Sequence, residues 1–151
     1  EKTYYIEDLE EKKITPIQIN VMLPKLKKGL RNRLDNINFH GNSSRLLDGS
    51  DVSLMRLKRL MKANPTLKVL IEGHTNGCSN GTSYSQTLSE GRASSIKKFL
   101  NKRKITEDRM KTIGYNCSRM LYPYARLEKD PITNNRQQSL NRRVEIIVID
   151  F

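Results

Sequence analysis

One arginine stands out because its spacing places its charge beside the apolar side of a predicted helix. The apolar side chains of that helix are Leu88, Ala93, Ile96, Phe99 and Leu100. Arg92 follows Leu88 by four residues and precedes Ile96 by four, and residues four apart share a helix face. A buried guanidinium needs an anionic or carbonyl partner, because an unpaired buried charge is too costly to keep. That partner comes either from the protein itself or from a ligand.

The two cysteines are a second candidate for chemistry. Cys78 and Cys117 lie 39 residues apart, each among the small polar residues typical of loops. They could form a disulfide, which the chain-entropy model values at roughly 3–4 kcal/mol and which would indicate an oxidising compartment. The alternative is two free thiols. Two cysteines and two histidines at scattered positions give no metal-ligand spacing, and we expect no metal and no cofactor.

The composition indicates a globular domain with excess positive charge. A chain of 151 residues can bury about two thirds of its unfolded surface. Its 28 basic and 16 acidic residues give a formal charge of +12, which favours nucleic acid, an anionic membrane face or a carboxylate-rich cell wall as partner. No apolar run is long enough to span a bilayer. Because the chain begins at Glu1 without Met, we expect it to be a piece of a longer protein.

The elements that must position these residues follow from the hydrophobic period. We expect residues 1–16 to be a linker or extension and residues 17–151 to form one domain. Strands are predicted at residues 17–23, 34–39, 67–71, 108–115 and 144–149, helices at 50–64 and 88–102, and a helical turn at 134–140. Residues 144–149 are apolar on both faces, as in an interior strand. This alternation predicts a sheet with two helices on one side.

The first predicted helix has clear ends. Ser50 is a plausible N-cap and Pro65 stops the helix after Asn64. Its predicted inward-facing side chains are Leu54, Leu57, Leu60 and Met61.

Several motifs together resemble the OmpA-like C-terminal domain. They are Ile37–Phe39 with Ser43 and Ser44, Ile71–Gly77, Leu88–Ala93, Ile105–Gly114 and Asn141–Ile146, in matching order over about residues 34–149. The resemblance implies an α+β fold, a two-layer sandwich of the βαβαβ type with a mixed sheet and helices packed on one face. Residues 23–39 are also similar to versions of the domain in Bacteroidetes-type envelope proteins.

The resemblance implies a non-catalytic module that binds the peptidoglycan stem peptide at the free amino-acid end of diaminopimelate. Arg92 occupies the position of the family arginine that binds the ligand carboxylate, and a planar guanidinium suits that group. Asn76 stands where the family has an aspartate for the ammonium, and a neutral acceptor forfeits that charge. Binding could therefore be weaker, the ligand could differ, or the pocket could be vestigial. The other predicted contacts are Phe39, His40, Asn42, Leu88, Arg142 and Arg143.

The same residues also have purely structural explanations. Arg92 could be a core arginine paired with Glu145 or Glu72. Arg142 and Arg143 could be ordinary charges at the start of a strand, one pointing inward and one outward. His74 is expected to be a structural donor within its turn, and His40 a loop residue at the pocket rim.

Other classes of function fit less well. An enzyme is not expected, because the sequence lacks a Ser/His/Asp order, a Cys with a His partner and paired loop carboxylates. Nucleic-acid binding is disfavoured by the scarcity of aromatic residues, six Tyr and three Phe. A module that docks onto proteins of an envelope or secretion complex is the stronger alternative. We expect a periplasmic domain that anchors an outer-membrane-associated protein to the wall, with its membrane tether outside this chain.

Overall fold

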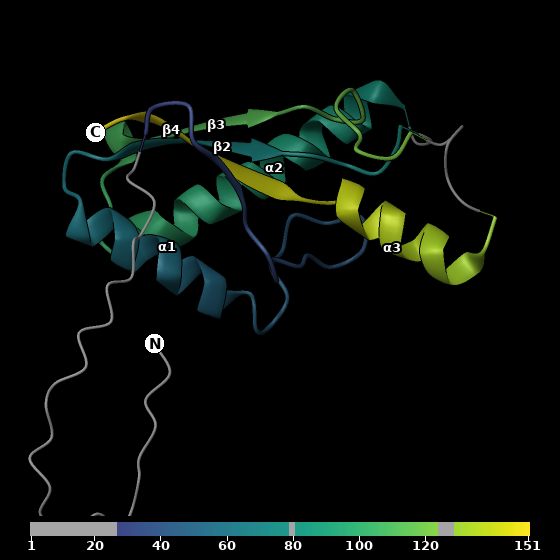
Figure 1. The fold of residues 1–151 in the computed structure, drawn as a ribbon, viewed down its shortest axis with the longest axis horizontal. Coiled ribbons are helices and arrows are strands. Elements are labelled where there is room, and N and C mark those ends of the chain that lie inside the picture. The colour runs from purple at the N-terminus through teal and green to yellow at the C-terminus, as the bar shows by residue number, and fades with distance from the viewer. Residues whose placement is uncertain (1–26, 79–80, 124–128) are drawn as a thin grey trace, which may run out of the picture.

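The chain folds into one mixed sheet with helices, as Figure 1 shows for the computed structural model, which describes residues 27–78, 81–123 and 129–151. Its elements are β1 (Arg31–Arg33), α1 (Asp51–Ala63), β2 (Lys68–Gly73), α2 (Thr82–Asn101), the 3-10 helix η1 (Glu107–Arg109), β3 (Met110–Gly114), α3 (Pro131–Asn141) and β4 (Val144–Asp150). The strand order is β1-β4-β2-β3. Strand β3 is parallel to β2, whereas β4 is antiparallel to both β1 and β2. The predicted α+β class with a mixed sheet is confirmed.

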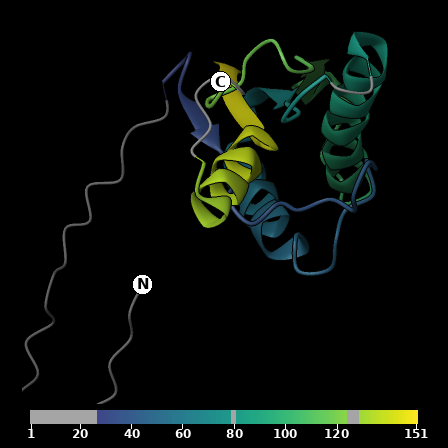
Figure 2. The same ribbon diagram turned by 90° about the vertical axis from the view of Figure 1, so that its right-hand side faces the viewer.

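Helices α1 and α2 supply the apolar layer that covers the sheet, while α3 lies beyond the end of the strands (Figures 1 and 2). The buried cluster joins Leu54 and Met61 of α1 and Ile96 of α2 to Val69 and Ile71 of β2. Among the helices that the structure describes, none has the length and apolarity needed to cross a bilayer.

Helix α1 lies where the sequence predicts it, with two differences in detail. Leu54 and Leu57 are buried, but Leu60, expected to face inward, is 41% exposed. Six residues after Leu54, it lies at the edge of the apolar stripe rather than on it. Ser50 makes no side-chain cap hydrogen bond; its hydroxyl instead exchanges two hydrogen bonds with the backbone of Asn38. It therefore fixes the loop before α1 instead of the helix itself.

The strand predictions succeed at β4 and fail at residues 34–39. Strand β4 lies between β1 and β2, as its two apolar faces predict. The strand at 34–39 is wrong: β1 ends at Arg33, and Asn36 turns the chain with a left-handed φ of 59°. Ile37 is buried because this loop folds under the sheet, and only Phe39 forms an isolated bridge, to Leu46. The strand predicted at 17–23 and the domain boundary at residue 17 lie outside the described residues.

Two helices are longer than the apolar pattern predicts. Helix α2 begins at Thr82, six residues before the first stripe residue, Leu88. Helix α3 begins at Pro131 instead of Asn134. Its start is capped, because the Asp130 side chain accepts a hydrogen bond of 2.8 Å from the backbone nitrogen of Thr133.

Helix α2 approaches β2 and β3 closely where both strands end in glycine. A Cβ on Gly73 would lie 2.1 Å from the carbonyl oxygen of Ser89, and one on Gly114 would lie 2.4 Å from the Ser89 hydroxyl. Both positions therefore exclude any larger side chain. The contact holds the turn of α2 that contains Arg92 at a fixed height above the sheet.

Replacing Gly73 with alanine should lower the free energy of unfolding by roughly 2–3 kcal/mol or prevent folding, because helix α2 must move away from the strand. Gly41→Ala is the matched control, since a Cβ there meets nothing within 4 Å. It should change stability by less than about 0.5 kcal/mol. Urea denaturation followed by circular dichroism measures both, and equal midpoints for the two variants would contradict the close approach.

Candidate functional site

A cavity of about 180 Å³ opens beside Arg92. Its lining residues come from the loop after β1, from the middle of α2 and from the end of α3; they are Ile37, Asn38, Phe39, Leu47, Arg92, Ser139 and Arg142. The structure therefore brings together three of the predicted site residues, Phe39, Arg92 and Arg142. Sequence reasoning missed the other four lining residues: Ile37 and Asn38 belong to the motif that ends at Phe39 but were not assigned to the site, and no motif distinguishes Leu47 or Ser139.

Arg92 is buried, with 5% of its surface exposed, yet no ion pair among the described residues includes it. Its Nε donates a hydrogen bond of 3.3 Å to the carbonyl oxygen of Ser43, and its guanidinium lies 5.1 Å from the centre of the Phe39 ring. Burial lowers the pKa of Arg92, and so does the positive charge of Arg142. Because arginine keeps its proton in proteins, the cavity has a cation with no acid of its own.

The loop from His40 to Arg45 packs against α2 and presents the Ser43 carbonyl to Arg92. The Tyr84 hydroxyl of α2 donates a hydrogen bond of 3.2 Å to the carbonyl of Asn42, a residue with a left-handed φ of 48°. His40 is bonded to Arg45 twice, through the backbone and through its Nε2, which lies 2.9 Å from the Arg45 guanidinium. His40 and Asn42 thus shape the loop at the cavity rim without lining the cavity itself.

The other predicted site residues lie elsewhere. Asn76 donates from its side-chain nitrogen to Gln138 at 3.1 Å, which ties the β2–α2 loop to α3 next to Ser139. Leu88 is half-buried on α2 and is not among the lining residues. Arg143 is buried at the start of β4, where it belongs to a separate cluster of charges.

That cluster is a buried network between β2 and β4. Glu72 and Glu145 are directly opposite in the sheet, and one terminal nitrogen of Arg31 contacts both carboxylates. Arg143 donates to Glu145 and, at 3.1 Å, to the carbonyl oxygen of Arg119. Burial alone would raise the pKa of Glu145, but the hydrogen bonds from Arg31 and Arg143 outweigh it and lower that pKa. The two acids that could have paired with Arg92 are therefore already neutralised.

His74 lies in the same network as a neutral group. Its side chain is 1% exposed and stacks on Tyr115 with ring centres 5.6 Å apart. Burial, followed by the positive charge of Arg143, lowers the pKa of His74 to about 4. Its distance of 3.9 Å from Glu72 is therefore not an ion pair at neutral pH. Neither ring nitrogen finds a hydrogen-bond partner within the described chain, so the expected side-chain donor role is wrong; only the backbone nitrogen donates, to Arg143.

Glu72, His74 and Glu145 each offer one atom that could hold a metal ion, all within 4.8 Å of one another. The arginines argue against that use, since Arg31 bridges the two carboxylates and occupies the position that a cation would need. We therefore assign no metal to this cluster.

Cys78 and Cys117 form a disulfide with their Cα atoms 5.7 Å apart, which confirms the predicted bridge over two free thiols. The bond joins the β2–α2 loop to the loop after β3. Next to it, the backbone nitrogen of Thr75 donates to the carbonyl of Asn116 at 2.9 Å. Buried Asn141 of α3 accepts hydrogen bonds from two backbone nitrogens of the second loop, at 2.8 and 2.9 Å. The loops at this end of the sheet are thus fixed to one another.

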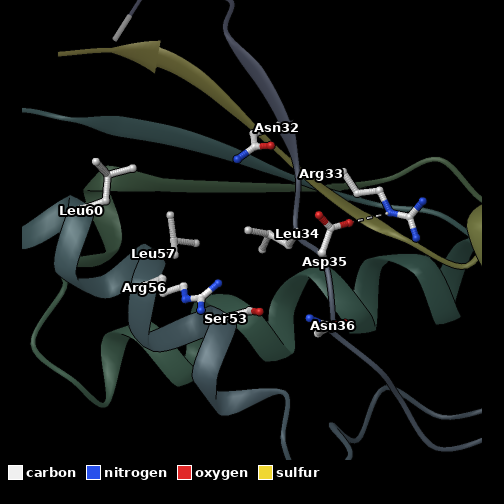
Figure 3. A pocket seen from close by; sticks show the side chains of 9 residues that line it. All are labelled: Asn32, Arg33, Leu34, Asp35, Asn36, Ser53, Arg56, Leu57 and Leu60. Carbon is white, nitrogen blue, oxygen red and sulfur yellow. Dashed lines mark ion pairs between the residues drawn. The ribbon is translucent and has the colours of Figure 1, made fainter. Parts of the chain in front are cut away.

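A larger cavity of about 270 Å³ lies between α1 and the segment that leaves β1 (Figure 3). Leu34, Leu57 and Leu60 give it an apolar floor, and the polar pair Arg33 and Asp35 is joined by an ion pair of 3.5 Å. None of the predicted site residues lines it. Because none of the predicted site residues lines this cavity, we place the candidate binding site at Arg92 instead.

The low pKa of His74 predicts acid sensitivity. Between pH 6.5, the usual His value, and pH about 4, the unfolded chain binds a proton that the folded protein does not. The free energy of unfolding should therefore fall as the pH is lowered through this window, by up to roughly 3 kcal/mol. His74→Gln should flatten the dependence measured by urea denaturation, whereas His40→Gln, the matched control in the rim loop, should retain it. An unchanged slope in His74→Gln would contradict the neutral assignment.

Removing the disulfide with the double substitution Cys78→Ser, Cys117→Ser should lower the free energy of unfolding by roughly 3–4 kcal/mol, because the unfolded chain regains the entropy of an open loop. Denaturation of the wild type with and without reductant checks the result, and the double variant should not respond to reductant. A wild-type midpoint that reductant does not shift would argue against the bond.

The OmpA family profile matches residues 38–131 of the chain. Peptidoglycan-associated lipoprotein of Buchnera aphidicola is 31% identical over 83% of the chain, which spans 64% of that protein. Outer membrane porin F of Pseudomonas aeruginosa is 32% identical over 81% of the chain and 32% of its own length. Photosystem I P700 chlorophyll a apoprotein A2 of Gloeobacter violaceus is 33% identical over 76% of the chain, but only 13% of that protein is covered. The chain thus spans less than two thirds of each of these relatives.

Solved structures show the same fold. An outer membrane protein from Borrelia burgdorferi B31 superposes with a TM-score of 0.59 at 27% identity, over 82% of this chain and 92% of the other. The cell wall anchor of the T6SS from Pseudomonas aeruginosa superposes with a TM-score of 0.61 at 22% identity, over 80% of each chain.

Proposed function

Because the chain belongs to the OmpA family, we propose that it binds the stem peptide of peptidoglycan, without catalysis, and thereby anchors an envelope protein to the cell wall. Two of the similar proteins carry this role in their names, a peptidoglycan-associated lipoprotein and a cell wall anchor. The ligand end that we propose is the diaminopimelate of the stem peptide.

The observation that carries the proposal is the unpaired cation in the cavity. Arg92 has a carbonyl and an aromatic ring as neighbours but no carboxylate, so it can accept one from a ligand. A carboxylate can form two parallel charge-assisted hydrogen bonds with a guanidinium. Each of these bonds is about twice as strong as a hydrogen bond between neutral groups. The volume of about 180 Å³ is below that of sites for whole small molecules, typically about 300–1,000 Å³, and fits the end of one amino-acid residue.

In this arrangement Arg92 binds the stem-peptide carboxylate, Phe39 packs against the aliphatic part of the ligand, and Arg142 lies across the cavity. His40 and Asn42 hold the rim loop. Asn76 fixes the β2–α2 loop to α3 through Gln138, and neither Asn76 nor Leu88 lines the cavity. Arg143 contributes by holding Glu145 in place, and we do not propose that it touches the ligand.

We propose a periplasmic location, with association to the outer membrane through a tether that is not part of this chain. The disulfide suits an oxidising compartment, and a net charge of +12 suits a wall rich in carboxylates.

A second candidate function is docking onto another protein of an envelope complex. Ile132 at the start of α3 is 81% exposed, and Leu121 in the preceding loop is 51% exposed. Exposed apolar side chains of this kind occur at protein contacts. Loss of wall binding with retained capture by an envelope protein would favour this candidate.

The proposal predicts that Arg92→Ala loses retention on purified sacculi, with an apparent affinity roughly 10- to 100-fold weaker, as expected for a lost charged hydrogen bond. Arg103→Ala is the matched control, because Arg103 also stacks on a phenylalanine, Phe99, at the far end of α2. It should bind like the wild type in a sedimentation assay.

Salt separates specific binding from adsorption of a basic protein. Retention of wild type and Arg103→Ala in about 0.5 M NaCl, with loss of Arg92→Ala, supports a defined site. If all three proteins bind alike at low salt and are released together at about 0.5 M, the proposed function is wrong.

A further inference from the structure

The charges around the Arg92 cavity bear on which kind of peptide end it accepts. Two of its seven lining residues are charged, and both are arginines, Arg92 of α2 and Arg142 at the end of α3. Burial and the neighbouring charge of Arg142 both lower the pKa of Arg92, as expected where two guanidinium groups repel each other. A cavity with this lining is most readily stabilised by a ligand with net negative charge.

The residues that line the cavity offer no acid to an ammonium group. Its lining, all of it within the described residues, contains neither Asp nor Glu. The buried acids Glu72 and Glu145 do not line the cavity, and both are held by Arg31. Asn76 is neutral and is not among the lining residues; its side-chain nitrogen donates to Gln138.

The neutral polar residues of the lining suit carboxylates. Asn38 has an amide group and Ser139 a hydroxyl, both of which can donate hydrogen bonds. Arg142 is exposed at the mouth, whereas Arg92 is buried within. An acidic group could therefore reach Arg92 while a second one, closer to solvent, lies against Arg142.

We propose that the cavity accepts an acidic peptide end as a net anion, with one carboxylate on Arg92 and a second on Arg142, and that an ammonium on that end adds no affinity. This rests on the proposed function, because the stem peptide is the assumed source of both carboxylates. It differs from recognition of a zwitterionic amino-acid end, in which the amine is bound as well as the carboxylate.

Isothermal titration of the intact protein with three synthetic stem peptides tests the inference. The peptides end in diaminopimelate with a free distal end, with its distal amine acetylated, or with its distal carboxylate amidated. Acetylation should leave the affinity unchanged within about twofold or improve it, whereas amidation should weaken binding about tenfold or more. A tenfold loss on acetylation would overturn the inference, because it would show that the ammonium is bound.

Arg142→Gln tests the second anionic contact. It should weaken binding of the acetylated peptide about fivefold or more. Arg136→Gln is the matched control, an exposed arginine on α3 that is not among the lining residues, and it should bind within about twofold of the wild type. Equal affinities for Arg142→Gln and wild type would remove Arg142 from the site and overturn the two-carboxylate arrangement.

Inorganic phosphate identifies the source of the negative charge. If the site is built for a peptide, phosphate should bind at least about tenfold more weakly than the acetylated peptide, and equal affinity would overturn a peptide source. The same experiments distinguish a failure of the proposed function from a failure of the two-carboxylate arrangement. If neither sacculi nor any peptide binds, the proposed function and this inference both fall. If the peptides bind but acetylation abolishes the interaction, only this inference falls.

Discussion

The rest of the site depends on how the protein distributes its buried charges. Two glutamates that face each other across β2 and β4 are both bound by Arg31, and Arg143 adds a further hydrogen bond to one of them. Glu72 and Glu145 are therefore both already paired with arginines other than Arg92. Arg92 is left with a backbone carbonyl and a phenyl ring. A buried pair of this kind adds little net stability, but it decides which arginine remains available to a ligand.

Backbone geometry then sets where that arginine lies. Strands β2 and β3 end in Gly73 and Gly114, and the absence of side chains there lets Ser89 of α2 press onto both strands. Ser89 also accepts a hydrogen bond of 3.0 Å from the backbone nitrogen of Asn116, so the loop after β3 is fixed to the same turn. Arg92 is one helical turn further on. Its position relative to the rim loop is therefore determined by rigid elements on both sides, which favours a defined binding geometry over an adaptable one.

Much of the fold could be predicted from the sequence, because the spacing of apolar residues indicates helices and strands and residues such as proline mark their ends. Spacing and residue type predict the doubly apolar run of β4, the end of α1 before Pro65 and the burial of Arg92, whereas Ser50 does not cap α1 with its side chain. The segment at residues 34–39 was misjudged, since Ile37 and Phe39 are apolar for packing under the sheet rather than for pairing within it. The start of α2 was placed too late, because its first turns carry polar residues that show no stripe.

The site was predictable where a charge conflicts with its surroundings and unpredictable where contacts depend on tertiary structure. Arg92 is the first case. Arg143 shows the limit: adjacent to Arg142 in sequence, it alternates to the opposite side at the start of β4 and pairs with Glu145. Which of two neighbouring arginines faces the cavity depends on where the strand begins, and the pattern of apolar residues does not resolve that to one position. Ser139 enters the lining only because α3 folds back beside the loop.

The disulfide has a mechanical consequence for the part of the chain that it encloses. Cys78 precedes α2 and Cys117 follows β3, so the helix that bears Arg92 lies wholly within the covalent ring. Pulling on the two ends of the chain can peel away β1, α1 or β4, but it cannot stretch the segment between the two cysteines, which are 39 positions apart. At about 3.4 Å per residue, the extended length of the pulled chain is shorter by roughly 130 Å than it would be without the disulfide. Tension therefore cannot extend the helix that carries Arg92 while the disulfide is intact, whereas Phe39 and Arg142 lie outside the ring.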